Sequence, residues 1–588
     1  MKGFFSHVLA SMLGTFLVLI LILIINLLIL LTMLSSSGAF SDKENDISDN
    51  AVLHLDFATP IADQSSAQPN LSTFNLDKTV SLRSFTKSIE KAKDDKRIKG
   101  IFLDLSFVQV GIASVEEIRR SLLDFKSSGK FIIAHADMYS HKSYYLATVA
   151  DKIYMTPEGM IQFTGLSAQV MFFKSMLDKI GIEPEIIRHG KFKSAVEPFM
   201  QDEISEANKE QTLKYTSSLW NTMLKGIEKQ RKISIAELNL IADSLKLQDS
   251  KSAKALKFVD DLKYKDQVLD ELKALSGTKN EDKLDLASLI KYMKNDQDFD
   301  DIMHPSDNLI ALIYAEGSIV EGKGGDGQIG SESLSEAIRE AREDKNVKAI
   351  VLRINSPGGS SLASEVIWRE TVLTQKVKPL IVSMGDVAAS GGYYIACAAD
   401  TIVAEPYTIT GSIGVFGLLF NAKELMKDIG VNVHSVNTNQ YSDFGSPMRK
   451  MTDFEKNVIQ NIVESVYQTF ITHVSEGRKL PVEKVDEIGQ GRVWSGEDAM
   501  AIGLVDRMGG LQTAMDIAVR MAGLKEYSVK TYPEKDKFAI ILESIIGEAK
   551  SAFIRGELGE SYTYYKRLQE LKKMDGIQAR IPYFLDIE

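Results

Sequence analysis

Ser390 and Lys193 are the two residues of this sequence that could act together as a nucleophile and its base. Ser390 follows an apolar run and precedes two glycines, which permit a sharp turn that presents the hydroxyl. A nucleophilic serine needs a base, and no histidine lies between His304 and His434. A lysine takes that role when burial lowers its pKa, because desolvation favours the neutral amine. Lys193 has apolar neighbours that could provide such burial, although a lysine taken singly is usually a solvated surface charge.

Two glycine turns could supply backbone N–H groups to a negative charge that develops beside Ser390. Gly391 starts the predicted helix after the serine, where N–H groups have no partner within the helix. Gly358 lies in a Pro-Gly-Gly turn after the neighbouring predicted strand. Ser412, in a third glycine-containing motif, could orient the lysine amine through a hydrogen bond. Each of these motifs also has a plainer interpretation as an ordinary tight turn.

The chain contains a tandem repeat. A shift of 249 residues aligns residues 89–165 with residues 338–414 without a gap. Each copy alternates short apolar runs with amphipathic stretches, which is typical of β-α units around a mainly parallel sheet. We therefore predict an α/β fold with two similar units. In the second copy the predicted helices are 334–343 and 391–399, and the predicted strands are 309–314, 349–354, 379–384 and 401–404.

The two copies keep different parts of the candidate site. The glycine turns and Ser390 occur only in the second copy, whereas the same shift places Ser442 opposite Lys193. This division predicts that the active centre forms where the copies meet. The polar stretch 275–306 is the expected junction. We therefore expect an N-terminal anchor, a first repeat that carries the lysine and a second repeat that carries the serine, at residues 1–36, 37–300 and 301–588.

The N-terminal segment has the composition of a membrane helix. Residues 8–41 carry no charged side chain, and residues 16–31 are almost all Leu, Ile and Val. A helix crosses a bilayer in roughly 20 residues, whereas the apolar core of a signal peptide has roughly 7–15. We expect a retained single-pass anchor with Lys2 on the cytoplasmic side, which in a Gram-negative cell places the rest of the chain in the periplasm at the inner membrane. A long signal peptide cleaved near residues 35–38 is the alternative.

Composition and motifs exclude several other classes of protein. The net charge of −11 and an isoelectric point near 5.5 give no general attraction to nucleic acid. The single cysteine, Cys397, excludes an intrachain disulfide, and no motif predicts a metal site. Residues 322–327 satisfy the glycine spacing of a dinucleotide-binding loop, but the next predicted strand ends at Asn355 rather than at an acidic residue. We expect no cofactor.

Taken together, the motifs resemble one known family. They are Asn355-Ser-Pro-Gly-Gly-Ser, Gly385-Asp-Val-Ala-Ala-Ser-Gly-Gly-Tyr-Tyr, Thr410-Gly-Ser-Ile-Gly-Val, Gly491-Arg-Val-Trp-Ser-Gly and Lys193-Ser-Ala-Val-Glu-Pro-Phe. Their order and spacing are similar to those of the signal peptide peptidase A (protease IV) family in its long, duplicated form. The resemblance implies a ClpP/crotonase-like fold, a serine endopeptidase with a dyad of Lys193 and Ser390, and a homo-oligomer, a tetramer, at the membrane. It also implies apolar peptide substrates, including cleaved signal peptides.

Two other functions stay open from the residues alone. An acyl-CoA hydratase or isomerase of the same fold would use the Gly358 and Gly391 N–H groups to hold a thioester oxygen, without a Ser-Lys pair. A catalytically silent membrane scaffold would account for the motifs that the first copy lacks. A C-terminal apolar stripe, at residues 538–553, is expected to pack in the core or between subunits.

Overall fold

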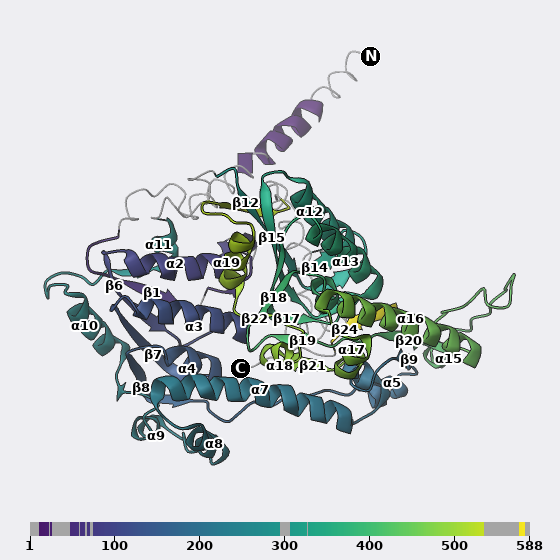
Figure 1. The fold of residues 1–588 in the computed structure, drawn as a ribbon, viewed down its shortest axis with the longest axis horizontal. Helices are drawn as coiled ribbons and strands as arrows, with labels where there is room; N and C mark the ends of the chain where they lie inside the picture. Colours follow the sequence, from purple (N-terminus) through teal and green to yellow (C-terminus); the bar gives the residue numbers. More distant parts are fainter. Residues whose placement is uncertain are drawn as a thin grey trace.

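Two α/β units lie side by side in the protein. The structure, a computed structural model, describes residues 11–22, 24–25, 47–57, 59–64, 67–70, 75–294, 306–325, 327–533 and 576–581. Figure 1 shows the first unit in purple to teal and the second in teal-green to yellow-green, with the N-terminal helix projecting away from both. This arrangement agrees with the two units that the internal repeat predicts.

The first unit is a six-stranded parallel sheet with helices on both faces. Leu53 and Ile101 point into one apolar core, whereas the adjacent residues Val52 and Phe102 point into the other, as expected for buried parallel strands. The strand order is β10-β8-β7-β6-β1-β11. The strands are β1 (Ala51–Asp56), β6 (Ile98–Asp104), β7 (Phe131–Tyr139), β8 (Lys152–Ile161), β10 (Asp261–Leu262) and β11 (Leu286–Ser288); helices α2 (Leu82–Asp94), α3 (Ile112–Lys126), α4 (His141–Ala147), α7 (Glu206–Arg231), α8 (Ile235–Asp243) and α9 (Ser250–Ala255) pack on the first face, and α10 (Lys265–Ser276) on the second.

The second unit repeats this architecture around an eight-stranded sheet. Its path is β21-β19-β17-β15-β12-β23, with β18 and β22 attached beside β17, and only the β19–β21 pair on this path is antiparallel. The strands are β12 (Leu309–Glu316), β15 (Val347–Ser356), β17 (Leu380–Ala389), β18 (Thr401–Ala404), β19 (Ile409–Gly411), β21 (Val493–Ser495), β22 (Arg507–Met508) and β23 (Ser528–Tyr532); α12 (Ser331–Glu343), α13 (Ser361–Gln375), α14 (Gly391–Ala396), α16 (Asp453–Arg478) and α17 (Val482–Ile488) cover one face, and α19 (Leu511–Met521) the other.

The predicted repeat is confirmed in its elements. The shift of 249 residues carries the bounds of α2 onto those of α12 and the bounds of α3 onto those of α13. Helices α7 and α16, which lie outside the gapless alignment, are both 26 residues long. Strand β18 has the predicted bounds, whereas β15 and β17 extend beyond the prediction at their carboxyl ends, toward the candidate site.

A mixed sheet that sequence analysis did not predict joins the two units. Its order is β14-β13-β16-β24-β20-β9, so one strand comes from the first unit and the others from later in the chain. All pairs that involve β20 or β24 are antiparallel. The strands are β9 (Glu183–Arg188), β13 (Ser318–Val320), β14 (Gln328–Gly330), β16 (Gly358–Ser360), β20 (Phe416–Asn421) and β24 (Gly576–Arg580).

The stretch expected to be the junction between the repeats contains regular structure. Strand β11 pairs with β1, and α11 (Leu289–Lys294) packs against α2, so this part of residues 275–306 belongs to the first unit. Residues 295–305 lie outside the described residues. The predicted apolar stripe at 538–553 also lies outside them.

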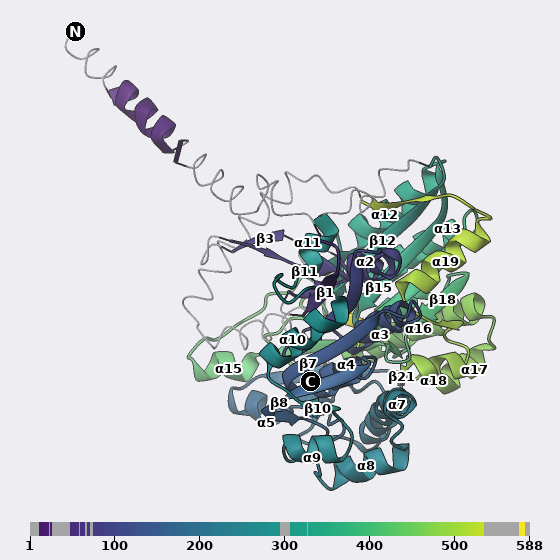
Figure 2. The ribbon, with the colours of Figure 1, turned by 90° about the vertical axis from the view of Figure 1, so that its left-hand side faces the viewer.

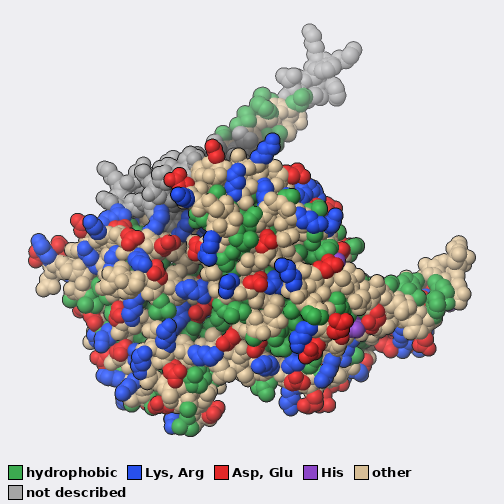
Figure 3. All heavy atoms as spheres, in the orientation of Figure 1, with side chains coloured by type: hydrophobic (Ala, Val, Ile, Leu, Met, Phe, Trp, Pro, Cys, Tyr) green, Lys and Arg blue, Asp and Glu red, His purple; other side chains and the backbone are tan. Residues whose placement is uncertain are grey.

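The N-terminal segment is described only in part. Residues 11–22 are helical, and the apolar side chains from Met12 to Ile22 are exposed along it. Figures 2 and 3 show this helix standing clear of the folded units with hydrophobic side chains on its surface. Among the described residues, none of the helices combines the length and the apolar character needed to span a bilayer. The rest of the predicted anchor at 1–36 lies outside the described residues.

A buried cluster of charges ties the first unit to the second. Arg353 on β15 is 1% exposed, and it forms ion pairs with Asp63, at 2.9 Å, and with Glu117 on α3, at 2.7 Å. The second carboxylate oxygen of Glu117 accepts a hydrogen bond from the Leu511 N–H at 2.8 Å. Asp386 on β17 accepts the Ala113 N–H at 2.8 Å. Because buried charges are costly when unpaired, this cluster fixes how the two units dock.

We expect Arg353→Leu to destabilise the protein by ~3–5 kcal/mol, because it leaves the carboxylates of Asp63 and Glu117 buried without their cation. The measurement is the midpoint of chemical unfolding, with the exposed Arg507→Leu as the matched control. A midpoint shift equal to that of the control would contradict the docking role.

Candidate active site

Ser390 lies between β17 and α14 in a backbone conformation that residues other than glycine rarely adopt. Its φ is 54° and its ψ is −112°. The Ser390 N–H donates to the Gly411 carbonyl at 2.8 Å, and its carbonyl accepts the Tyr394 N–H at 2.8 Å. Such a conformation costs of order 1–3 kcal/mol and persists where the surroundings hold it. The strand and the helix therefore fix the position of the hydroxyl.

Lys193, from the first unit, reaches Ser390 in the second. Its Nζ lies 2.7 Å from the Ser390 Oγ and 3.1 Å from both the carbonyl oxygen and the Oγ of Ser412. All three partners are neutral oxygens. The Lys193 side chain is fully buried, and this burial holds its pKa well below the usual 10.5. The geometry brings together the three side chains that the sequence singled out as nucleophile, base and orienting hydroxyl.

Close backbone packing around Lys193 depends on glycine. A methyl group built on Gly491, whose φ is +79°, would lie 2.6 Å from the Lys193 Cα, and one on Gly414 would lie 3.2 Å from the Lys193 Cδ. The next residue, Arg492, accepts the Ser412 N–H at 2.7 Å through its carbonyl. The segment that carries Gly491 therefore holds the lysine and Ser412 in register.

Gln211 on α7 is a positioning residue that sequence reasoning missed. Its amide nitrogen donates to the Phe192 carbonyl at 3.0 Å and to the Ser194 Oγ at 2.9 Å. Phe192 and Ser194 are the residues directly before and after Lys193. Its amide oxygen accepts the Val493 N–H of the second unit at 3.2 Å. One buried carboxamide thus connects the lysine loop to the strand beside Ser412. No spacing rule in the sequence links residue 211 to residue 193.

The two glycines proposed as hydrogen-bond donors lie against each other. A methyl group built on Gly358, whose φ is +95°, would lie 2.7 Å from the Gly391 nitrogen and 2.0 Å from the Ala579 carbonyl oxygen. In this structure the Gly358 N–H donates to the Ser356 Oγ at 3.1 Å. A side chain at position 358 would therefore collide with neighbouring backbone atoms, so this position requires glycine.

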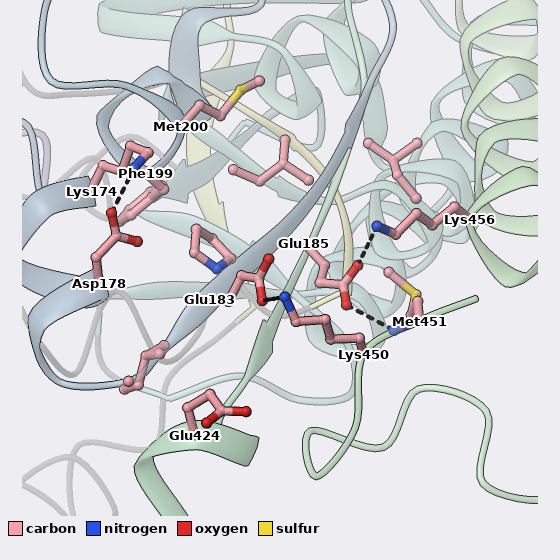
Figure 4. Close-up of a pocket in the computed structure, with 15 residues that line it drawn as sticks. Lys174, Asp178, Glu183, Glu185, Phe199, Met200, Glu424, Lys450, Met451 and Lys456 are labelled. Atoms are coloured by element: carbon pink, nitrogen blue, oxygen red, sulfur yellow. Dashed lines mark hydrogen bonds and ion pairs between the residues drawn. The ribbon is translucent and has the colours of Figure 1, made fainter. Parts of the chain in front are cut away.

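A separate cavity of about 550 Å³ lies beside β9 and does not include Ser390 or Lys193. Figure 4 shows ion pairs across it, between Glu183 and Lys450 and between Glu185 and Lys456. Glu185 also accepts the Met451 N–H at 2.8 Å. These contacts attach the first turn of α16 and the segment before it to β9, the strand that leads to the Lys193 loop.

Comparison with known proteins gives the family. The model of peptidase family S49 matches residues 124–279 and 373–525, once in each unit. The chain belongs to peptidase family S49. The pairing of one match with each unit also agrees with the internal repeat.

Relatives of this S49 peptidase match over most of both chains. Protease 4 of Salmonella typhi is 37% identical over 484 residues, which cover 80% of this chain and 77% of the relative. The chloroplastic serine protease SPPA of Arabidopsis thaliana is 35% identical over 509 residues, covering 85% of this chain and 74% of the relative. The protein is accordingly a serine peptidase, and neither the hydratase nor the silent scaffold finds support.

Solved structures add little to the family assignment. A mutant of ClpP1 from Listeria monocytogenes is 14% identical and covers 35% of this chain and 94% of its own, with a TM-score of 0.24. A mutant of the 1510-N membrane-bound stomatin-specific protease is 15% identical and covers 39% of this chain and 100% of its own, with a TM-score of 0.26. Scores this low carry no argument about the S49 units.

We expect Gln211→Leu to lower kcat for a quenched apolar peptide by ~10–100-fold while KM changes little, because small misplacements of reacting groups are costly. The physical reason is that the Lys193 loop loses its link to Val493. Lys209→Ala, an exposed change on the same helix, is the control. Equal kcat in the two variants would show that Gln211 does not position the lysine.

Proposed function

We propose that this protein is a Ser-Lys endopeptidase in which Ser390 is the nucleophile and Lys193 is its general base. The observation that carries the proposal is the 2.7 Å contact between a fully buried amine and the hydroxyl of the other unit. A lysine that loses its proton to burial can accept one from a serine. Ser412, which accepts from the same amine, would hold it in the orientation for transfer.

The reaction follows from the positions of these groups. Neutral Lys193 takes the Ser390 proton as the serine oxygen attacks the peptide carbonyl, and the resulting ammonium then gives that proton to the leaving amine. The oxyanion would be held by the N–H of Gly391 and by that of Gly358, which exchanges its Ser356 hydroxyl partner for the substrate oxygen. Water, deprotonated by the same lysine, hydrolyses the acyl-enzyme.

Replacing either member of the dyad is expected to abolish turnover. Lys193→Ala and Ser390→Ala should each lower kcat for a quenched apolar peptide by at least ~10⁴-fold, because the nucleophile and the base act as a unit. Lys191→Ala, an exposed lysine two positions away, is the matched control and should keep its rate. Full activity in either dyad variant would refute the assignment.

The pH profile tests the protonation state of the base. Only the neutral amine accepts a proton, and burial holds the Lys193 pKa well below 10.5. We therefore expect kcat/KM to rise with pH along a limb that is complete well below 10.5 and to fall as acid protonates the amine. A rising limb centred at the ordinary lysine value would contradict a desolvated base.

Apolar peptides, including cleaved signal peptides, are the proposed substrates, and the inner membrane is the proposed location. The resemblance of the motifs to signal peptide peptidase A supports the substrates, and the uncharged segment at residues 8–41 supports the location. The N-terminus would be cytoplasmic and the catalytic units periplasmic. A tetramer is proposed from the family resemblance. Exposed apolar side chains on the projecting segment 429–444 offer a surface for contacts between copies: Ile429, Val431, Val433, Val436 and Phe444.

Deletion of residues 1–36 tests the anchor. The full chain should stay with membranes through an alkaline wash, because roughly 20 apolar residues suffice to span the bilayer. The shortened chain should appear in the soluble fraction with its peptidase activity intact. Recovery of the full chain in the soluble fraction would show that the segment is not an anchor.

A further inference from the structure

Strand β9 is the last strand of the mixed sheet, and one of its edges is free. In the part of the chain that the structure describes, β9 pairs with β20 and with no other strand. The His189 N–H donates to the Val415 carbonyl at 3.1 Å, directly after the paired residues of β9 and β20. Hydrogen-bonded and non-hydrogen-bonded pairs alternate along an antiparallel ladder, so the pair of Ile186 and Leu418 is not hydrogen-bonded. The N–H and carbonyl of Ile186 therefore point away from β20.

The sequence of β9 agrees with this assignment of the free edge. Pro184 lies two residues before Ile186, so its carbonyl faces the same way. Proline has no N–H to donate, and within sheets it occurs on edge strands, where its nitrogen faces away from the ladder. None of the described residues forms a hydrogen bond with the outward backbone groups of Pro184 and Ile186. Such an unpaired edge is a template for a further strand.

The cavity of about 550 Å³ lies along this free edge. The described residues that line it come from both faces of β9 and not from β20. On one face Phe199 belongs to the same apolar cluster as Ile186. On the other face the Met451 N–H binds Glu185. Figure 4 shows these two walls on opposite sides of the β9 ribbon, so the edge lies at the bottom of a slot.

The side chains of the slot favour an apolar ligand without charge. Its charged groups are already paired with one another, in the ion pairs Lys174–Asp178, Lys450–Glu183 and Lys456–Glu185. A charged ligand would have to compete with one of these pairs. The apolar part of the lining is Ile182, Phe199, Met200 and Met451. Methionine side chains adapt to apolar groups of different shape, so these walls can accept a range of apolar side chains.

We propose that the free edge of β9 is an exosite, a binding site apart from the catalytic centre, at which an extended apolar peptide joins the mixed sheet as an additional strand. The peptide would accept the Ile186 N–H and donate to the carbonyls of Pro184 and Ile186. Its side chains would alternate between the two walls of the slot. Neither Ser390 nor Lys193 lines the cavity, so the exosite does not depend on the proposed Ser-Lys chemistry.

A proline at position 186 tests the role of the free edge. Ile186→Pro removes the outward N–H without removing a bond to β20, and Ile186→Val, which keeps that N–H, is the matched control. The probe is a short fluorescein-labelled peptide of alternating leucine and valine, titrated into chains that also carry Ser390→Ala. We expect the Ile186→Pro chain to bind one equivalent of the probe fewer than the Ile186→Val chain. Equal stoichiometry and equal affinity in the two chains would overturn the inference.

A charge in one wall tests the slot without changing the strand. Met200 is 39% exposed, so Met200→Asp should fold, and it places a carboxylate where the probe would bury apolar side chains. We expect the affinity of the exosite for the probe to fall at least ~10-fold, because the carboxylate would lose water without gaining a partner. Leu213→Asp, an exposed change outside the cavity, is the control and should bind the probe normally. Unchanged affinity in Met200→Asp would contradict the proposal.

Light scattering separates a bound peptide from a second copy of the chain. If the edge of β9 paired with another copy, Ile186→Pro would lower the oligomeric mass and leave binding of the probe unchanged, which would overturn the inference. The proposed exosite predicts the same mass for Ile186→Pro and Ile186→Val. Probe binding is measured in chains without the Ser390 hydroxyl, so a failure of the exosite and a failure of the Ser-Lys assignment are separate results.

Discussion

A lysine amine withdrawn from water and held against a serine hydroxyl is the interaction on which the rest of this structure depends. Burial of an ammonium ion without a carboxylate partner is costly, so the amine gives up its proton instead. A neutral amine can donate its two N–H groups to the two Ser412 oxygens and accept a hydrogen bond from the Ser390 hydroxyl through its lone pair. A contact of 2.7 Å between different units also demands that the units dock within a few tenths of an ångström. Much of the architecture supplies that accuracy.

Three sets of contacts, at increasing distance from Lys193, hold the first unit against the second. Nearest the amine, Gly491 and Gln211 fix the lysine loop against the second unit. Next, β9 pairs with β20 in the shared sheet, just before that loop begins. Farther away, the buried Arg353 cluster joins the faces of the two units. Because the fold is duplicated, the second copy can hold Ser390 in a fixed turn while the first copy provides Lys193 as the candidate base.

The sequence predicted the local structure better than the contacts between distant segments. The bounds of β18 follow from apolar periodicity, and the correspondence of α2 with α12 follows from the internal repeat. The repeat drew attention to the motifs of Ser390 and Lys193, because each motif survives in only one copy. The choice of Lys193 as the base came from the family resemblance, and the chemical roles of both residues stay a prediction. The shared sheet escaped notice because its antiparallel pairs join β9, β20 and β24, which lie far apart in sequence. Gln211 was missed for the same reason, since its role is visible only once α7 packs beside residue 493.

The most direct test of the account is the protonation of Lys193 itself. In protein labelled with ¹⁵N at lysine Nζ, the signal that disappears in Lys193→Ala identifies this amine, and its shift can be followed with pH. The account predicts a titration midpoint well below 10.5, because burial disfavours the charged amine. A midpoint at or above 10.5 would mean that Lys193 remains charged beside Ser390, and it could not then act as the base.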